Sequence, residues 1–341
     1  MNFYTLTFRK KIILSFLIIL GGLITLDIGL YFFENIKSTK TTFINDKFSK
    51  IKYFKLNNLK GKDIVFVGSS KTFYHISTNK FRENGIDIFN FGVSGVQFED
   101  YPTFIPYINS VNPKMVVFSL SVDRLYNKLN ISKYPTLDEI EYYYYIDKIK
   151  FLQSLKQWIV NRHIFLQYSE AIFYEVKSIY EKFESPIELN NETFNSKKSS
   201  KDKSINYSTL ANCKVFDVRQ VADTSTALKC INGDGVLLGS NIISNNINTK
   251  ELKTFNQQSI KFLHKIIANI DKEETKVLLI FEPTLHNTFT YKLDNIKKEF
   301  KGIEILDLTN LKIQDSFWWN NNHLNYQGRG QYSQYLSDIL K

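Results

Sequence analysis

Two hydroxyl side chains and one imidazole stand at positions of this 341-residue chain where they could act together as a nucleophile and a base. The stretch "VFVGSS" carries Ser69 and Ser70 directly after an apolar run, and "WWNNNHLNYQG" carries His323 near the other end of the chain. A serine hydroxyl is a weak nucleophile until a neighbouring base takes its proton, and histidine can be that base because its pKa lies near neutrality. The pattern therefore indicates acyl transfer through a serine, provided that the fold brings the two segments together.

Each of these residues also has a purely structural interpretation. Ser69 and Ser70 stand where a hydroxyl could cap the helix that follows them. His323 could be a surface histidine in a polar loop. Gly92 and Gly95, in the stretch "NFGVSG", could serve only to allow a tight turn. The choice depends on the elements that position these side chains.

Short apolar runs alternate with helical segments at the two ends of the chain, as in a parallel sheet whose two faces are both covered. We predict five strands, at 63–68, 86–92, 114–121, 276–283 and 303–310. We predict helices at 78–84, 98–109, 252–270, 290–300 and 327–340. Ligands bind at the carboxyl ends of the strands in an open parallel sheet. We therefore expect Ser70, after the first strand, and His323, after the fifth, to meet at that edge.

The alternation stops near residue 125 and resumes after about residue 250, which predicts an insertion at 126–250 between the third and fourth strands. We divide the insertion into a mainly helical part, a mobile polar loop rich in Ser, Asn and Lys, and a cysteine-containing segment, at 137–183, 186–210 and 211–250. The last segment holds Cys213 and Cys230, and we expect a disulfide between them. Two unpaired thiols are the alternative.

The first 60 residues predict attachment to a membrane. Residues 12–33 are an apolar run that would span about 33 Å as a helix, which matches a hydrocarbon core. The basic residues within 1–11 favour a cytoplasmic N-terminus. A cleaved signal peptide is the alternative, but no small-x-small cleavage site follows the run. We expect a single-pass signal anchor in the inner or cytoplasmic membrane, a stalk at 34–60 and the bulk of the chain outside the cytoplasm.

The three polar blocks and their order resemble those of the SGNH, or GDSL-like, hydrolase superfamily. In that family a Gly-Asp-Ser block follows the first strand, and exported membrane-anchored members often have Gly-Ser-Ser; "VFVGSS" is similar and makes Ser70 the nucleophile. "NFGVSG" resembles the second block, whose last glycine, here Gly95, is an oxyanion donor. "NNNHLNYQG" is similar to the last block through His323. The resemblance covers 61–125 and 251–341 and implies that they form one catalytic domain.

The fold that the resemblance implies is a three-layer α/β fold, SGNH- or flavodoxin-like, with a parallel five-stranded sheet. The long helical insertion and the N-terminal transmembrane helix are additions to it. The resemblance also implies that His323 is the base and that the backbone amides of Ser70 and Gly95 stabilise the oxyanion.

Two positions depart from the family's pattern. The family's Asp three residues before the histidine is Asn320 here, which can orient an imidazole but cannot stabilise an imidazolium by charge. Asp315 or a backbone carbonyl is an alternative for the orienting role. The family's third oxyanion donor, an Asn, corresponds to Asp123, and its carboxylate would repel a developing oxyanion unless it turns away, for instance toward Arg124.

The resemblance implies an extracytoplasmic serine esterase or O-acyltransferase that modifies a cell-envelope glycan through an acyl-serine intermediate. A membrane-bound O-acyltransferase is the implied partner, and the insertion would shape the substrate groove or dock that partner. The alternative, suggested by Asn320 and Asp123, is a catalytically silent relative that binds glycan or scaffolds the complex. A third possibility is an anion-binding loop at 68–70.

The distribution of charge and the spacing of the histidines limit the kinds of partner and cofactor that we expect. The 44 basic and 34 acidic residues give a net charge of +10, but the lysines are scattered and no nucleic-acid-binding motif is present. His75, His163, His264 and His286 show no metal-ligand spacing with each other or with cysteine. We therefore expect no nucleic acid, no metal and no cofactor.

Overall fold

The structure, a computed structural model, describes a defined part of the chain. The described residues are 13–15, 17, 18, 21, 22, 24, 25, 47, 50, 51, 54, 59–162, 206–222, 225–241, 249–271 and 275–341. Most of the expected anchor at 12–33 and stalk at 34–60, the helix expected beyond 162 and most of the polar loop at 186–210 lie outside them. Within the described ranges, no helix is both long enough and apolar enough to cross a membrane.

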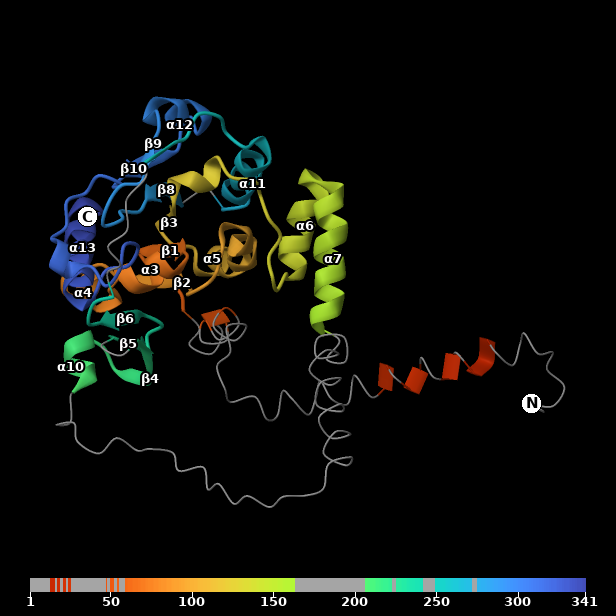
Figure 1. The fold of residues 1–341 in the computed structure, drawn as a ribbon, viewed down its shortest axis with the longest axis horizontal. Helices are drawn as coiled ribbons and strands as arrows, with labels where there is room; N and C mark the ends of the chain where they lie inside the picture. The colour runs from red at the N-terminus through yellow and green to blue at the C-terminus, as the bar shows by residue number, and fades with distance from the viewer. Residues whose placement is uncertain are drawn as a thin grey trace, which may run out of the picture. The chain divides into compact units, whose positions relative to one another are not determined.

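A five-stranded parallel sheet carries the fold (Figure 1). Its strands, in chain order, are β1 (Ile64–Gly68), β2 (Ile88–Gly92), β3 (Met115–Leu120), β8 (Lys276–Phe281) and β10 (Glu304–Asp307). In space they run β10-β8-β3-β1-β2. From β1 the chain goes to the edge strand β2, then crosses back to β3 on the other side of β1 and continues to β8 and β10. The strand order therefore changes direction between β1 and β3. This confirms the predicted α/β fold with its parallel sheet, and it places the crevice for a ligand at the carboxyl ends of β1 and β3.

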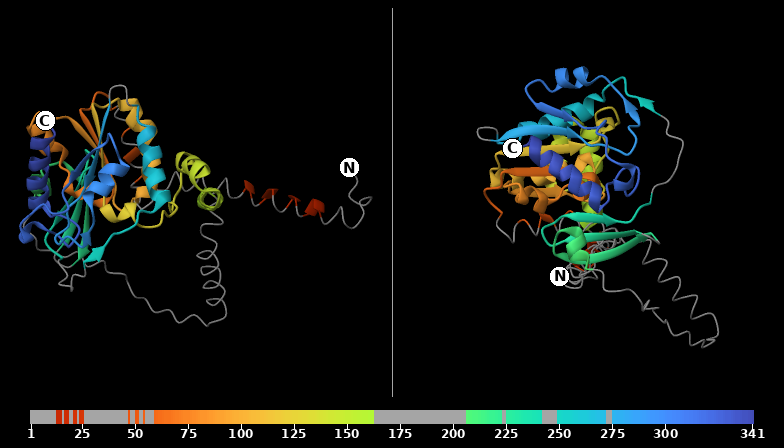
Figure 2. Two further views of the ribbon diagram at one scale, coloured as in Figure 1. Left: turned by 90° about the horizontal axis from the view of Figure 1, so that it is seen from above. Right: turned by 90° about the vertical axis from the view of Figure 1, so that its left-hand side faces the viewer.

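Helices cover both faces of the sheet (Figure 2). One face packs against α4 (Thr78–Glu83) and α13 (Tyr326–Ile339). The other packs against η2 (Phe98–Phe104), α5 (Ile105–Val111), α11 (Gln257–Ala268) and α12 (Leu293–Glu299). Because side chains alternate along a strand, Phe66 of β1 packs in the cluster of Phe81 and Tyr332. Its neighbour Val67 packs in the opposite cluster with Phe262.

The chain divides into two compact units, residues 1–41 with 155–202, and residues 42–154 with 203–341. The sheet and its covering helices belong to the second unit. That unit also contains η3 (Val122–Leu125), α3 (Ser70–His75), α6 (Leu137–Ile146), α10 (Tyr207–Ala211), η4 (Asp315–Phe317) and the short pair β7 (Lys250–Glu251) with β9 (Phe289–Thr290). Helix α7 spans Lys148–Arg162. The described residues between 13 and 25 in the first unit are helical.

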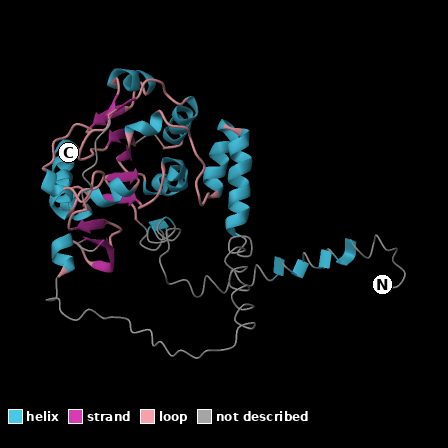
Figure 3. Ribbon diagram, viewed as in Figure 1, coloured by secondary structure: helices cyan, strands magenta, loops and turns pink. Residues whose placement is uncertain are grey.

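The cysteine-containing segment forms a small antiparallel sheet that the sequence analysis did not predict (Figure 3). Its strands are β4 (Val215–Ala222), β5 (Ser225–Cys230) and β6 (Gly235–Leu238), and a disulfide joins Cys213 to Cys230. The turn before β6 is tied to the main sheet's helices through Asp234. Its carboxylate accepts hydrogen bonds from the Thr78 hydroxyl at 2.6 Å and from the Arg329 guanidinium at 2.6 Å, and all three residues are buried. The small sheet therefore braces α3, α4 and α13, the elements next to the candidate site.

Candidate active site

Ser70 is placed at the carboxyl end of β1 by a tight passage from strand to helix. β1 ends at Gly68, and α3 begins at Ser70. A Cβ atom on residue 68 would lie 1.8 Å from Thr72 Oγ1, so only glycine lets α3 pack this closely on the strand. Ser69 occupies the position before the helix, but its side chain makes no capping hydrogen bond. The capping interpretation of the two serines therefore does not hold for Ser69.

His323 lies in the loop between η4 and α13, and that loop is held at both ends. Asn325 caps α13, because its side chain accepts hydrogen bonds from the backbone N–H groups of Gln327 and Gly328 at 3.0 and 3.2 Å. On the other side, Trp318 forms an isolated antiparallel bridge with Leu324, and both are buried. The loop folds back on itself as a short hairpin, which fixes the direction of the His323 side chain.

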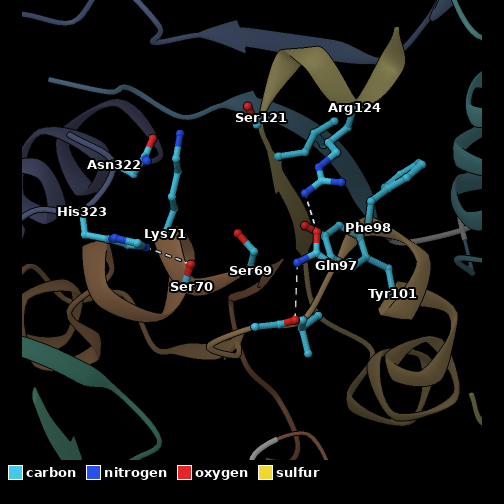
Figure 4. Close-up of a pocket in the computed structure, with 13 residues that line it drawn as sticks. Ser69, Ser70, Lys71, Gln97, Phe98, Tyr101, Ser121, Arg124, Asn322 and His323 are labelled. Carbon is cyan, nitrogen blue, oxygen red and sulfur yellow. Dashed lines mark hydrogen bonds between the residues drawn. The ribbon is translucent and has the colours of Figure 1, made fainter. Parts of the chain in front are cut away.

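The structure brings Ser70 and His323 together: Ser70 Oγ lies 2.9 Å from His323 Nε2 (Figure 4). His323 Nδ1 lies 3.1 Å from Asn320 Oδ1, and the same oxygen accepts the backbone N–H groups of Asn322 at 2.9 Å and His323 at 2.8 Å. Three donors facing one oxygen fix the orientation of the Asn320 amide. Because an amide oxygen can only accept, Nδ1 carries the proton and Nε2 presents its lone pair to the serine hydroxyl.

The surroundings of His323 keep its ring neutral. Burial lowers the pKa of His323 to about 3, with further lowering by His75 and Lys71 and an opposing effect of Glu282. A neutral ring is the form that can accept a proton from Ser70. No carboxylate contacts its Nδ1 in the described part of the chain, so nothing at that position stabilises the imidazolium by charge.

A second imidazole supports the loop from below, and the sequence analysis missed it. His75 Nδ1 lies 2.7 Å from Glu282 Oε2, and His75 Nε2 accepts the backbone N–H of Leu324 at 3.1 Å. Both side chains are almost fully buried. His75 comes from the end of α3 and Glu282 from the end of β8, so this pair ties the helix of Ser70 to the loop of His323.

The charge of Glu282 is stabilised within the protein. Burial opposes its ionisation, but His75, the hydroxyl of Ser119 and the charge of Lys71 outweigh that effect, so that the pKa of Glu282 lies below its usual value. Ser119 and Thr72 both donate hydrogen bonds to it. Two signals in the sequence could have pointed to the pair: a carboxylate that ends an apolar strand just before a proline, and a histidine five residues after Ser70.

Ser70 and His323 open into a pocket of about 210 Å³ at the carboxyl edge of the sheet (Figure 4). Its walls are formed by Ser69, Ser70, Lys71, Gly95, Val96, Gln97, Phe98, Tyr101, Leu120, Ser121, Arg124, Asn322 and His323. Gly95 has φ of +81°, a conformation that favours glycine. Among the described residues its N–H donates to no backbone carbonyl. The pocket therefore contains Ser70, His323 and the glycine expected to serve the oxyanion.

Asp123 does not line this pocket. Its carboxylate accepts hydrogen bonds from the Ser121 hydroxyl and from Asn127 Nδ2, the latter at 2.7 Å. Arg124 points into the pocket instead and donates to the Gln97 side chain. The carboxylate thus turns away as anticipated, but toward Ser121 and Asn127 rather than toward Arg124.

The remaining sequence candidates lie away from the Ser70–His323 pair. Asp315 is an exposed residue of η4, and Asn320 takes the position beside the imidazole. On the surface, His264 Nε2 lies 3.7 Å from Glu299 Oε1. His163 lies outside the described residues. No cluster of three or more His, Cys, Asp or Glu suited to a metal ion occurs in the described part of the chain.

Comparison with known proteins gives little beyond this geometry. No family model matches the chain, and no curated protein matches it. One solved structure, described as "a putative platelet activating factor from Streptococcus pneumonia", is similar over 92% of this chain and 99% of its own length, with 8% sequence identity and a TM-score of 0.36. A likeness at this level establishes no shared activity. What the fold and the site define is an α/β protein with a hydrogen-bonded serine–histidine–asparagine chain at the carboxyl edge of its parallel sheet.

Proposed function

We propose that this protein is a serine esterase or O-acyltransferase that forms an acyl-enzyme on Ser70. The observation that carries the proposal is the 2.9 Å contact between Ser70 Oγ and His323 Nε2, with Asn320 holding the ring in the tautomer that accepts a proton. His323 removes the hydroxyl proton as Ser70 attacks the ester carbonyl, and it returns a proton to the departing alcohol. The backbone N–H groups of Ser70 and Gly95 stabilise the tetrahedral oxyanion.

The acyl-enzyme is then discharged by water or by a sugar hydroxyl that enters the same pocket. The first outcome is hydrolysis and the second is transfer, and His323 acts as base for either nucleophile. The resemblance to SGNH hydrolases and the apolar run at 12–33 support an enzyme anchored outside the cytoplasm, with a cell-envelope glycan as substrate and a membrane-bound O-acyltransferase as partner.

A catalytically silent glycan-binding or scaffolding role is the second candidate. It is favoured by Asn320, which stands where a carboxylate would stabilise an imidazolium. It is also favoured by Asp123, whose side chain points away from the pocket, so that this position supplies no hydrogen-bond donor to an oxyanion. Under this alternative the pocket binds a glycan without cleaving it.

Trapping of the acyl-enzyme separates the two candidates. The full-length chain is incubated briefly with p-nitrophenyl acetate, quenched in acid, and digested for peptide mass spectrometry. The enzymatic proposal predicts an acetyl group on the peptide that contains Ser70, and no acetyl group there in the Ser70→Ala variant. An unmodified Ser70, in a protein shown to be folded by circular dichroism, favours the silent role.

A further inference from the structure

The charged side chains that line the pocket beside Ser70 are all positive. Of the residues that form its walls, Lys71 and Arg124 are cationic and none is a carboxylate. Figure 4 shows the two side chains coming from different elements, Lys71 from α3 and Arg124 from η3, on either side of Ser69. Like charges that face a common cavity raise each other's free energy unless an anion lies between them.

Lys71 feels the charge of Glu282, but no carboxylate of the described residues lies within ion-pair distance of its ammonium. Among the described residues its ammonium makes no hydrogen bond and no ion pair, although the side chain is partly buried. Burial lowers the pKa of Lys71, and Arg124 adds to that effect, whereas Glu282 and Asp123 oppose it. Both of those carboxylates are already occupied, Glu282 by His75 and Asp123 by Asn127. The ammonium is therefore available to a ligand.

Arg124 is available in the same way. Its guanidinium has five N–H donors. Within the described residues it uses one nitrogen, Nη2, to donate to the Gln97 side chain, which is neutral. A planar guanidinium suits carboxylate and phosphate groups, which it can bind through two parallel hydrogen bonds. Gln97 also lines the pocket and steadies the guanidinium there.

We infer that the pocket accepts an ester whose alcohol part, the glycan, bears a carboxylate or a phosphate close to the acylated hydroxyl. The anion lies between Lys71 and Arg124 while the ester carbonyl lies at Ser70. The substrate class is thus an anionic glycan, such as a uronic acid polymer or a polyol phosphate, rather than a neutral polysaccharide. The reaction assumed here rests on the proposed function, but the anion site itself can be tested without catalysis.

Kinetics with matched esters test the inference in the active enzyme. Acetate release is measured with an O-acetylated methyl glucoside, the corresponding methyl glucuronide and an O-acetylated glycerol phosphate. We expect kcat/KM to be about tenfold to a hundredfold higher for an anionic ester, since a charged hydrogen bond contributes about that factor. The two anionic arms show whether carboxylate or phosphate is preferred. Equal kcat/KM for neutral and anionic esters would overturn the inference.

Two variants show that the preference comes from these side chains. Lys71→Gln and Arg124→Gln are each expected to lower kcat/KM for the preferred anionic ester about tenfold more than for the neutral ester. Lys261→Gln and Arg82→Gln remove the same charges from exposed positions outside the pocket, and serve as matched controls. An equal loss on both esters would assign the two cations to the oxyanion instead, and would contradict the anion site.

Binding to the Ser70→Ala variant separates this inference from the proposed function. Calorimetry is carried out with methyl glucuronide, glycerol phosphate and methyl glucoside. We expect an anionic ligand to bind at least about tenfold more tightly than methyl glucoside, and the difference to disappear when Arg124→Gln is added. This result stands even if Ser70 never becomes acylated. Equal affinity for all three ligands refutes the anion site, whatever the activity of the wild-type chain.

Discussion

Replacing Asn320 by Asp adds a carboxylate at the place where the structure shows a neutral amide. Asn320 Oδ1 lies 3.1 Å from His323 Nδ1, and the residue is partly exposed, so that water limits the cost of burying the new charge. A carboxylate can accept the same three N–H donors as the amide oxygen. We therefore expect Asn320→Asp to preserve the geometry of the ring and to change mainly its pKa.

The magnitude follows from the charge. Two opposite charges about 4 Å apart attract by about 4 kcal/mol at an effective dielectric constant of about 20, and desolvation offsets part of this. Opposite charges this close typically shift a pKa by about 1–3. Since the pKa of His323 is about 3, the variant would reach roughly 5. A rise of about 2 in the pKa of His323 corresponds to about 2.7 kcal/mol of added stabilisation of the imidazolium. If the transition state gains about half of this stabilisation, kcat/KM rises about tenfold.

The assay is the pH dependence of kcat/KM for p-nitrophenyl acetate. The wild-type profile should show no loss from imidazole protonation down to roughly pH 5, because the ring is neutral there; the acid limb of the Asn320→Asp profile should move up toward pH 5. Asn322→Asp adds the same charge at the residue next to His323. The ring nitrogens of His323 contact Asn320 and Ser70 rather than the Asn322 side chain, so this variant should shift the limb less. The reasoning is refuted if Asn320→Asp changes neither the acid limb nor kcat/KM.

Four other changes test separate parts of the structure. Glu282→Gln should lower the unfolding free energy by about 2–4 kcal/mol and should lower kcat, because it weakens the buried support of the His323 loop; chemical denaturation and acetate release measure both, and an unchanged midpoint contradicts the support role. Asp123→Asn should alter kcat/KM by less than about threefold, since its side chain points away from the pocket; a gain of about a hundredfold would instead indicate a restored oxyanion donor. Cys213→Ser should cost about 3 kcal/mol of stability by opening the loop to Cys230, which a denaturant titration without reductant measures. His323→Gln should make the unfolding free energy less dependent on acid pH. The pKa of His323 in the folded state is depressed to about 3, so the unfolded state takes up a proton first as pH falls. The wild type therefore loses about 2 kcal/mol of stability between about pH 6.5 and about pH 5, and the variant does not lose this contribution.

The parallel sheet could be predicted because its strands are short continuous apolar runs with turn residues after them. β1, β2 and β3 each begin within two residues of the predicted start, and β1 and β2 end at the predicted glycines. The same reasoning placed Ser70 and His323 at one edge, since residues that follow parallel strands share that edge. The predicted helix at 98–109 is instead the 3₁₀ helix η2 followed by α5, and Pro102 lies within η2.

The parts that were not predicted depend on contacts between distant segments. The His75–Glu282 pair joins residues 207 positions apart, and it forms only when the end of α3 meets the end of β8. The glutamate before Pro283 and the histidine after Ser70 are each unusual in the sequence, but neither indicates which residue it pairs with. The antiparallel sheet of β4, β5 and β6 lies in a segment with many polar residues, where β5 buries only some of its side chains. Its place in the fold is fixed by Asp234, which accepts hydrogen bonds from Thr78, far before it in the sequence, and from Arg329, far after it.

The central claim is that Ser70 is an activated nucleophile, and labelling with a fluorophosphonate probe tests it most directly. The full-length wild type, Ser70→Ala and Ser69→Ala are incubated with the probe, and the labelled peptide is identified by mass spectrometry. Ser69 lines the same pocket but makes no hydrogen bond with His323, so it is the matched control. We predict a label on Ser70 in the wild type and in Ser69→Ala, and none in Ser70→Ala. A folded wild type that stays unlabelled, or that carries the label on Ser69, would contradict the account.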